Sequence, residues 1–178
     1  MGKVFKTLDR ESIVVNTKCG RHNIGTVDFC AGLIIDSIGR SLQRLQIDFV
    51  DSIILHIPPR ELLDGNGVDH YEILERLHDE GKIRAYGDSV DFAWEIQMLL
   101  ETTEAKVFQC FFNILHQDCK RAFESIQSNN AIVIAKIPFD SGWLTGKYHA
   151  ESQFEGIRER WSEKTSAPVL VWLIALKQ

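Results

Sequence analysis

The 178-residue sequence has no cluster of Lys and Arg, no apolar run of the roughly 20 residues that would span a bilayer, and no signal-peptide core after Met1. Its net charge is −5. Nucleic-acid surfaces concentrate positive charge, so this balance argues against such a partner and favours small-molecule ligands. We therefore predict a single cytoplasmic domain over residues 1–178, with no membrane partner.

Cysteine is also scarce: the chain has 4, and none forms a CxxC pair. The 6 histidines do not accompany them at the intervals typical of zinc sites. The spacing therefore predicts neither a disulfide framework nor a metal site. Cys110 lies on an apolar strand-like run, where a small buried hydrophobic role is expected.

The apolar runs that are present alternate with helical patterns. Near-continuous runs are typical of strands covered on both faces, and they predict strands at 13–17, 49–55, 83–87, 107–112 and 131–136. Helical periodicity predicts helices at 31–45, 71–80, 92–101 and 119–128, with Gly81 as a left-handed C-terminal cap. This order predicts an α/β fold with a parallel sheet, right-handed crossovers and about five strands, fewer than the eight of a closed TIM barrel.

A second apolar segment, 167–176, lies near the end of the sequence and is too short to cross a membrane. It is either part of a core helix or a surface for another chain.

Polar residues stand where the predicted strands end. In a β/α barrel the carboxyl ends of the strands form the reactive face, and side chains alternate between the two faces of a strand. If the last polar residue of each strand points into the mouth, the pocket holds Lys18, His56, Ser89, Gln109, Asn113 and Lys136.

Lys18 and His56 carry the chemistry that this pocket suggests. A lysine lowers the pKa of a neighbouring phenol, and an imidazole can orient a carbonyl oxygen or relay its proton. The pair therefore indicates polarisation of a carbonyl group in a small organic ligand. The structural alternatives are a solvated lysine and a histidine that is only hydrogen-bonded, and both stay open at this point.

Several ordered motifs resemble one family. The stretches that carry the resemblance are 41–51 (SLQRLQIDFVD), 55–59 (LHIPP), 77–89 (LHDEGKIRAYGDS), Gln109 with 112–115 (FNIL), and 138–148 (PFDSGWLTGKY). Together they are similar to the aldo/keto reductase family over about residues 13–161. The resemblance implies a (β/α)8 barrel that reduces aldehydes and ketones with NADPH through an Asp, Tyr, Lys and His tetrad.

The resemblance assigns roles by position. Lys18 matches the tetrad lysine and His56 the tetrad histidine. Ser89 and Gln109 match residues that hold the nicotinamide carboxamide. Lys136 falls where many members stack an aromatic residue on the nicotinamide and some have a basic one.

Other family features have no counterpart in these residues. The tetrad Asp and Tyr precede the lysine strand in the family, whereas only 17 residues precede Lys18 here, with Asp9 among them but no tyrosine. The family's eighth strand and adenosine-phosphate segment would also follow Gln178. We therefore expect an incomplete barrel, truncated at both ends, with impaired reductase activity. The alternative is a non-catalytic relative that acts as a binding module or self-associates through open sheet edges.

Overall fold

The computed structural model describes residues 2–23, 26–65, 69–149, 152–156 and 159. The chain divides into two compact units, Met1–Lys136 and Ile137–Gln178.

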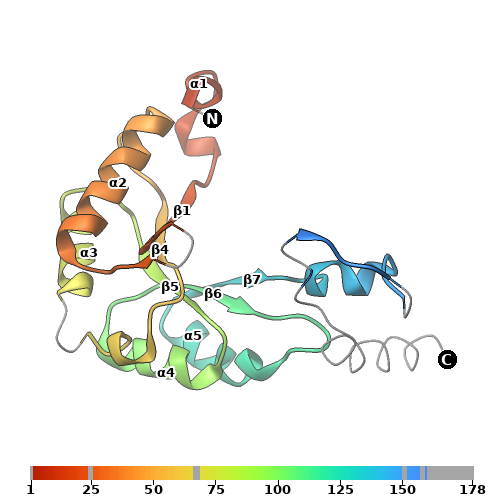
Figure 1. Ribbon diagram of the computed structural model, residues 1–178. Helices are drawn as coiled ribbons and strands as arrows, with labels where there is room; N and C mark the ends of the chain where they lie inside the picture. Colours follow the sequence, from red (N-terminus) through yellow and green to blue (C-terminus); the bar gives the residue numbers. More distant parts are fainter. Residues whose placement is uncertain (1, 24–25, 66–68, 150–151, 157–158, 160–178) are drawn as a thin grey trace. The chain divides into compact units, whose positions relative to one another are not determined.

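The first unit is built on a five-stranded parallel sheet with the order β1-β4-β5-β6-β7 (Figure 1). The strands are β1 (Asn16–Cys19), β4 (Ser52–Leu55), β5 (Tyr86–Val90), β6 (Val107–Phe111) and β7 (Ile132–Lys136). The strands lie across the sheet in chain order, as successive β/α units produce. The predicted α/β class and partial barrel are confirmed.

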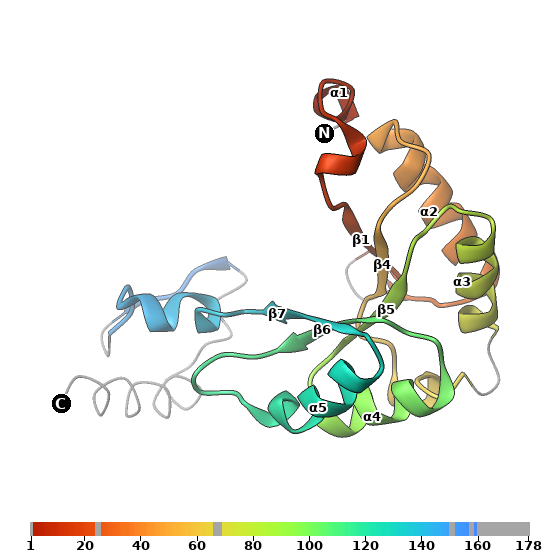
Figure 2. The same cartoon turned by 180° about the vertical axis from the view of Figure 1, so that it is seen from behind.

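The principal helices of this unit lie on one side of the sheet, as both views show (Figures 1 and 2). They are α2 (Ala31–Leu45), α3 (His70–Asp79), α4 (Ala93–Thr102) and α5 (Phe123–Ser128), which the 3₁₀ turn η3 (Asp118–Ala122) precedes. The shorter elements are α1 (Gly2–Phe5), η1 (Arg10–Ser12), β2 (Arg21–Asn23), β3 (Thr26–Val27) and η2 (Arg60–Leu62). The opposite face of the sheet has no helix in the described part of this unit.

Helix α2 has the bounds that its periodicity predicts. Ile34 and Ile38 are buried, while Asp36 and Arg40 form an exposed ion pair at 2.8 Å on the other side. Gly81 follows α3 and has the left-handed conformation predicted for it, with a φ of 70°. The Gly81 N–H donates to the carbonyl of residue 78 at 2.8 Å, and the next N–H to that of residue 77 at 3.0 Å, which is the Schellman pattern.

The core fills the space between the sheet and these helices. Phe108, Leu55, Leu74 and Ile96 are all fully buried there. Cys110 is also fully buried, which confirms its predicted role as a small hydrophobic residue. The four cysteines are free thiols, and the described residues contain no cluster suited to a metal ion.

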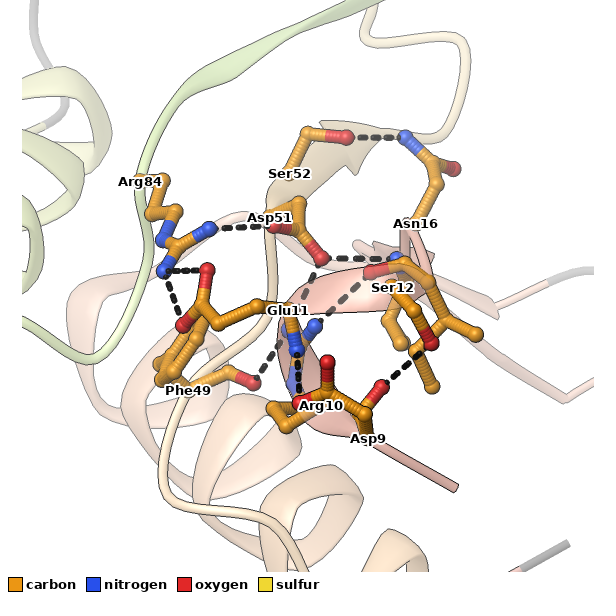
Figure 3. A network of polar contacts seen from close by, with 11 residues as sticks. Asp9, Arg10, Glu11, Ser12, Asn16, Phe49, Asp51, Ser52 and Arg84 are labelled. Carbon is orange, nitrogen blue, oxygen red and sulfur yellow. Dashed lines mark hydrogen bonds and ion pairs between the residues drawn. The ribbon is translucent and has the colours of Figure 1, made fainter. Parts of the chain in front are cut away.

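The first three strands begin three residues later than predicted, at 16, 52 and 86 rather than 13, 49 and 83. Pairing there is reduced to an isolated parallel bridge between Val50 and Ile83, and a polar network accompanies it (Figure 3). Asp51 Oδ2 accepts hydrogen bonds from the Val15 N–H at 2.8 Å and from Arg10 at 2.7 Å. Asp51 Oδ1 accepts from Arg84 at 3.1 Å. The predicted apolar runs are therefore present, but the Val15 N–H bonds a side chain instead of a neighbouring strand, which delays the start of regular pairing.

The same network encloses an aromatic ring. The guanidinium groups of Arg10 and Arg84 lie 4.0 and 4.1 Å from the centroid of the Phe49 ring. Two cations on one ring gain from the negative faces of its π system, and the Asp51 carboxylate balances their charge. The N-terminal turn η1 is thereby fixed to the amino ends of β4 and β5.

In the second unit, the described structure consists mainly of the 3₁₀ segment η4 (Asp140–Thr145). Trp143 is buried, and the centroid of its ring lies 5.2 Å from that of Tyr148 and 5.6 Å from that of Phe154. The apolar segment 167–176 lies outside the described residues. No helix in the described ranges has the length and apolar character to cross a bilayer.

Candidate functional site

The strand register brings five of the six predicted site residues to one face of the sheet. Paired residues on parallel strands point to the same side, and the pairs Lys18 with Ile54, Ser89 with Gln109, and Phe111 with Lys136 belong to that face. His56 follows β4, and its N–H donates to the carbonyl of residue 19 at 2.9 Å, which extends the same alternation. This is the face that carries no helix.

Lys18 and His56 are close enough for the charge of the lysine to act on the imidazole. Burial, and then the charge of Lys136, lowers the pKa of Lys18. Burial, and then the charges of Lys18, Arg21 and Lys136, lowers the pKa of His56, so its imidazole is neutral at pH 7. No ion pair holds Lys18 within the described part of the chain. A partly desolvated cation beside a neutral imidazole can polarise a carbonyl group and stabilise negative charge on its oxygen.

Lys136 ends the edge strand β7, and its side chain reaches the end of β5. Its ammonium donates to Ser89 Oγ at 3.0 Å and pairs with Asp91 Oδ1 at 2.7 Å. Only 15% of the Lys136 side chain is exposed. Asp91, which follows β5, was missed by the sequence reasoning. The only signal for it was an acidic residue placed directly after the carboxyl end of a strand.

Gln109 offers an unused acceptor beside Ser89. Its Oε1 atom is buried and accepts no hydrogen bond from the described residues. A buried polar atom without a partner costs free energy, so such an atom is a sign of a missing ligand group. The carboxamide of a nicotinamide fits here, because its N–H can donate to Gln109 while its carbonyl oxygen accepts from a neighbouring donor.

Asn113 holds the loop that follows β6. Its Oδ1 accepts from the backbone N–H groups of Leu115 and His116, at 2.8 and 3.1 Å. These bonds fix the turn that follows β6. His116 in turn stacks on Phe111 with ring centroids 4.1 Å apart. Asn113 therefore supports the loop beside the face, and a contact with substrate stays a prediction.

A pocket of about 520 Å³ opens where β5 and β6 end. Its lining includes Asp91, Phe92, Phe111 and His116. Because Asp91 also pairs with Lys136, the pocket borders the polar face. It has the size of a small-molecule site.

The tyrosines of the first unit lie behind the sheet. The Tyr71 hydroxyl donates to Asp88 Oδ1 at 3.2 Å, and the Tyr86 hydroxyl donates to Glu75 Oε1 on α3 at 3.0 Å. Both rings are buried on the helix side. Tyr86 therefore faces the helices, and in the described part of this unit no tyrosine reaches the polar face.

Comparison with known proteins agrees with this arrangement. The chain is 31% identical over 163 residues to an NADH-specific methylglyoxal reductase of Escherichia coli, covering 82% of this chain and 49% of that protein. It is 39% identical over 89 residues to an L-galactose dehydrogenase of Arabidopsis thaliana, covering 49% of this chain and 28% of that protein. The chain thus spans about half the length of the first of these relatives.

Solved structures show the same fold. A glycerol dehydrogenase of Gluconobacter oxydans superposes with a TM-score of 0.76 at 22% identity, over 98% of this chain and 56% of that one. An aldo-keto reductase of Bacillus halodurans superposes with a TM-score of 0.72 at 26% identity, over 88% of this chain and 53% of that one. The model of the aldo/keto reductase family matches residues 1–177. The chain belongs to the aldo/keto reductase family.

Proposed function

We propose that this chain serves the NADPH-dependent reduction of an aldehyde or ketone. The carbonyl would lie at Lys18 and His56, and the nicotinamide at Ser89, Gln109 and Lys136. The observation that carries the proposal is the buried, unpaired Gln109 Oε1 on the same sheet face as Lys18. That face combines a hydrogen-bond acceptor for a carboxamide with a cation for a carbonyl oxygen.

Each side chain has a role that follows from its state. The neutral imidazole of His56 donates an N–H hydrogen bond that orients the substrate carbonyl. The Lys18 ammonium stabilises the negative charge that develops on the carbonyl oxygen. A reduced nicotinamide, when bound, supplies the hydride. Ser89 and Gln109 fix the carboxamide and so determine which face of the ring meets the substrate.

The proton needs a donor as well. Because no phenol reaches this face in the described part of the first unit, the alkoxide would take its proton from Lys18 or from water. A positioned general acid contributes roughly a hundredfold or more to the rate. We therefore propose that these 178 residues alone turn over slowly.

A direct test is a fluorescence titration of NADPH with size-fractionated protein, followed by reduction of methylglyoxal. Methylglyoxal is a reasonable first substrate because one relative is a methylglyoxal reductase, and NADH should be titrated in parallel because that relative is NADH-specific. We expect saturable cofactor binding and slow turnover. Lys18→Met and His56→Ala should lower turnover by about tenfold or more while the thermal midpoint stays unchanged.

Matched controls are available on the same unit. Lys106 and His78 have side chains that are 40% and 55% exposed, and both lie outside the polar face. Lys106→Met and His78→Ala should leave turnover unchanged. Equal losses in the controls, or the absence of saturable binding in the wild type, would contradict the proposal.

The second candidate function is a non-catalytic module that self-associates. The sheet ends at β1 and β7, and neither strand has a second neighbour among the described residues. Val14 beside β1 is 84% exposed, and Ile132 on β7 is 56% exposed. Open edges with apolar side chains favour pairing with a second copy. A concentration-dependent dimer in light scattering that Ile132→Lys weakens, combined with no cofactor binding, would favour this function.

A further inference from the structure

The Lys136 ammonium lies between two oxygen atoms. It is 2.7 Å from Asp91 Oδ1 and 3.0 Å from Ser89 Oγ. Ser89 is only 1% exposed, whereas 41% of the Asp91 side chain is exposed. The ammonium donates a hydrogen bond to Ser89 Oγ, whereas its contact with Asp91 Oδ1 is an ion pair, because Asp91 Oδ1 accepts no hydrogen bond in the described structure. The carboxylate therefore attracts Lys136 by its charge, and Lys136 donates to the buried serine.

This arrangement fixes what the Ser89 hydroxyl can do. Since its oxygen accepts from Lys136, its own proton must point elsewhere. The neighbouring residue in the register is Gln109, yet the Gln109 Oε1 atom has no hydrogen-bond partner in the described structure. The face thus presents an O–H donor and a carbonyl acceptor on adjacent strands, and neither is satisfied by the other.

We propose that Asp91 is a positioning residue for the cofactor. It holds Lys136 against Ser89, and the Ser89 proton is thereby directed to the carbonyl oxygen of a primary carboxamide, whose N–H donates to Gln109. This inference rests on the proposed function and extends it to a residue that does not itself touch the nicotinamide. The ligand class is a planar group with one acceptor and one donor on the same carbon.

A cofactor analogue distinguishes the hydrogen bond of the carboxamide oxygen with Ser89 from that of the carboxamide N–H with Gln109. The reduced cofactor with a 3-acetylpyridine ring keeps the carbonyl oxygen but lacks the N–H. Asp91→Ala should weaken both ligands by the same factor, about five- to tenfold, because each loses the Ser89 bond. Gln109→Leu should weaken the carboxamide cofactor by a similar factor and leave the acetyl analogue within about twofold.

A double-mutant cycle tests whether Asp91 acts through Ser89. The dissociation constant of NADPH is measured by fluorescence for the wild type, Asp91→Ala, Ser89→Ala and the double variant. We expect each single variant to bind about five- to tenfold more weakly, and Asp91→Ala to add less than about twofold in the Ser89→Ala background. A carboxylate that only stabilises the fold would have the same effect in both backgrounds.

The control is Glu101→Ala, which removes an exposed carboxylate from the last turn of α4. It should not change the dissociation constant, and thermal unfolding of every variant shows whether the fold is kept. Additive effects in the cycle would overturn the role of Asp91 while the proposed function stands. No saturable NADPH signal in the wild type would overturn both.

Discussion

Asp88 should make this protein less stable as the pH rises through neutrality. It lies on β5 and points to the helix side, where it is fully buried. Its Oδ1 accepts from the Tyr71 hydroxyl at 3.2 Å, but its Oδ2 has no hydrogen-bond partner in the described structure. Burial raises the pKa of Asp88 to about 7; the Tyr71 bond opposes this shift, and the charge of Glu95 adds to it.

The sign of the effect follows from proton linkage. The folded state holds the Asp88 proton up to about pH 7, whereas the unfolded chain releases it near the ordinary pKa of 3.8. The stability that Asp88 contributes is therefore complete below about pH 4 and is lost as the pH rises to 7. One pKa unit corresponds to about 1.4 kcal/mol, so the loss is at most about 4 kcal/mol.

The perturbation that isolates this group is Asp88→Asn. The amide keeps the shape and an acceptor for Tyr71 but cannot ionise. We expect the difference in unfolding free energy between variant and wild type to grow by about 1 kcal/mol per pH unit between pH 5 and 6.5, in favour of the variant. Above pH 7.5 the variant should be more stable by about 2–4 kcal/mol. Urea unfolding at each pH gives these values.

The control for a carboxylate that titrates in water is Asp79→Asn, because 84% of the Asp79 side chain is exposed. Its unfolding free energy should follow the wild type at every pH. A constant difference between Asp88→Asn and wild type from pH 5 to 8 would refute the reasoning, because it would mean that Asp88 keeps an ordinary pKa in the folded state.

Other predictions concern the network at the amino ends of the strands and two glycines. Asp51→Ala should destabilise the fold by about 2–3 kcal/mol in urea unfolding at pH 7, because it removes the acceptor of the Arg10 guanidinium and the Val15 N–H. Burial alone would raise the pKa of Asp51, but the Val15 and Arg10 donors lower it below its ordinary value. The stability that Asp51 contributes is therefore present above pH 4 and is lost on acidification. An Asp51→Ala variant as stable as the wild type at pH 7 would contradict this. Gly87→Ala should cost about 3 kcal/mol or prevent folding, since a Cβ atom would lie 1.7 Å from the carbonyl oxygen of residue 107. Gly81→Ala should cost only about 1 kcal/mol in the same assay, because its φ is left-handed but the space around it is open.

Most of the first unit could be predicted from local sequence. The helical periodicity of the apolar residues predicted both ends of α2 correctly. Gly81 marked the turn after α3, because glycine adopts a left-handed backbone conformation without strain. The start of the strands could not be predicted this way. The residues before β1 are apolar, but Asp51 takes the hydrogen bond of Val15, and no local pattern shows that a carboxylate 36 positions away will do so.

The candidate site also has features that local sequence predicts and features that it does not. Strand alternation was enough to place Lys18, Ser89 and Gln109 on one face, because the pleat alternates side chains with a fixed period. Alternation could not show which groups Asn113 bonds, since a loop after a strand has no fixed period; its side chain bonds its own turn, and a contact with substrate stays a prediction. Asp91 was missed for the same reason.

The sequence by itself therefore determined the order of elements, the side chains that share one sheet face and the family, because these depend on periodicity and on ordered motifs along the chain. The tertiary structure decided which polar atoms meet. It paired Lys136 with Asp91 and Ser89, left Gln109 Oε1 without a partner, and buried Asp88 against Tyr71. These contacts join separate β/α units, so their geometry exists only after the strands have packed side by side.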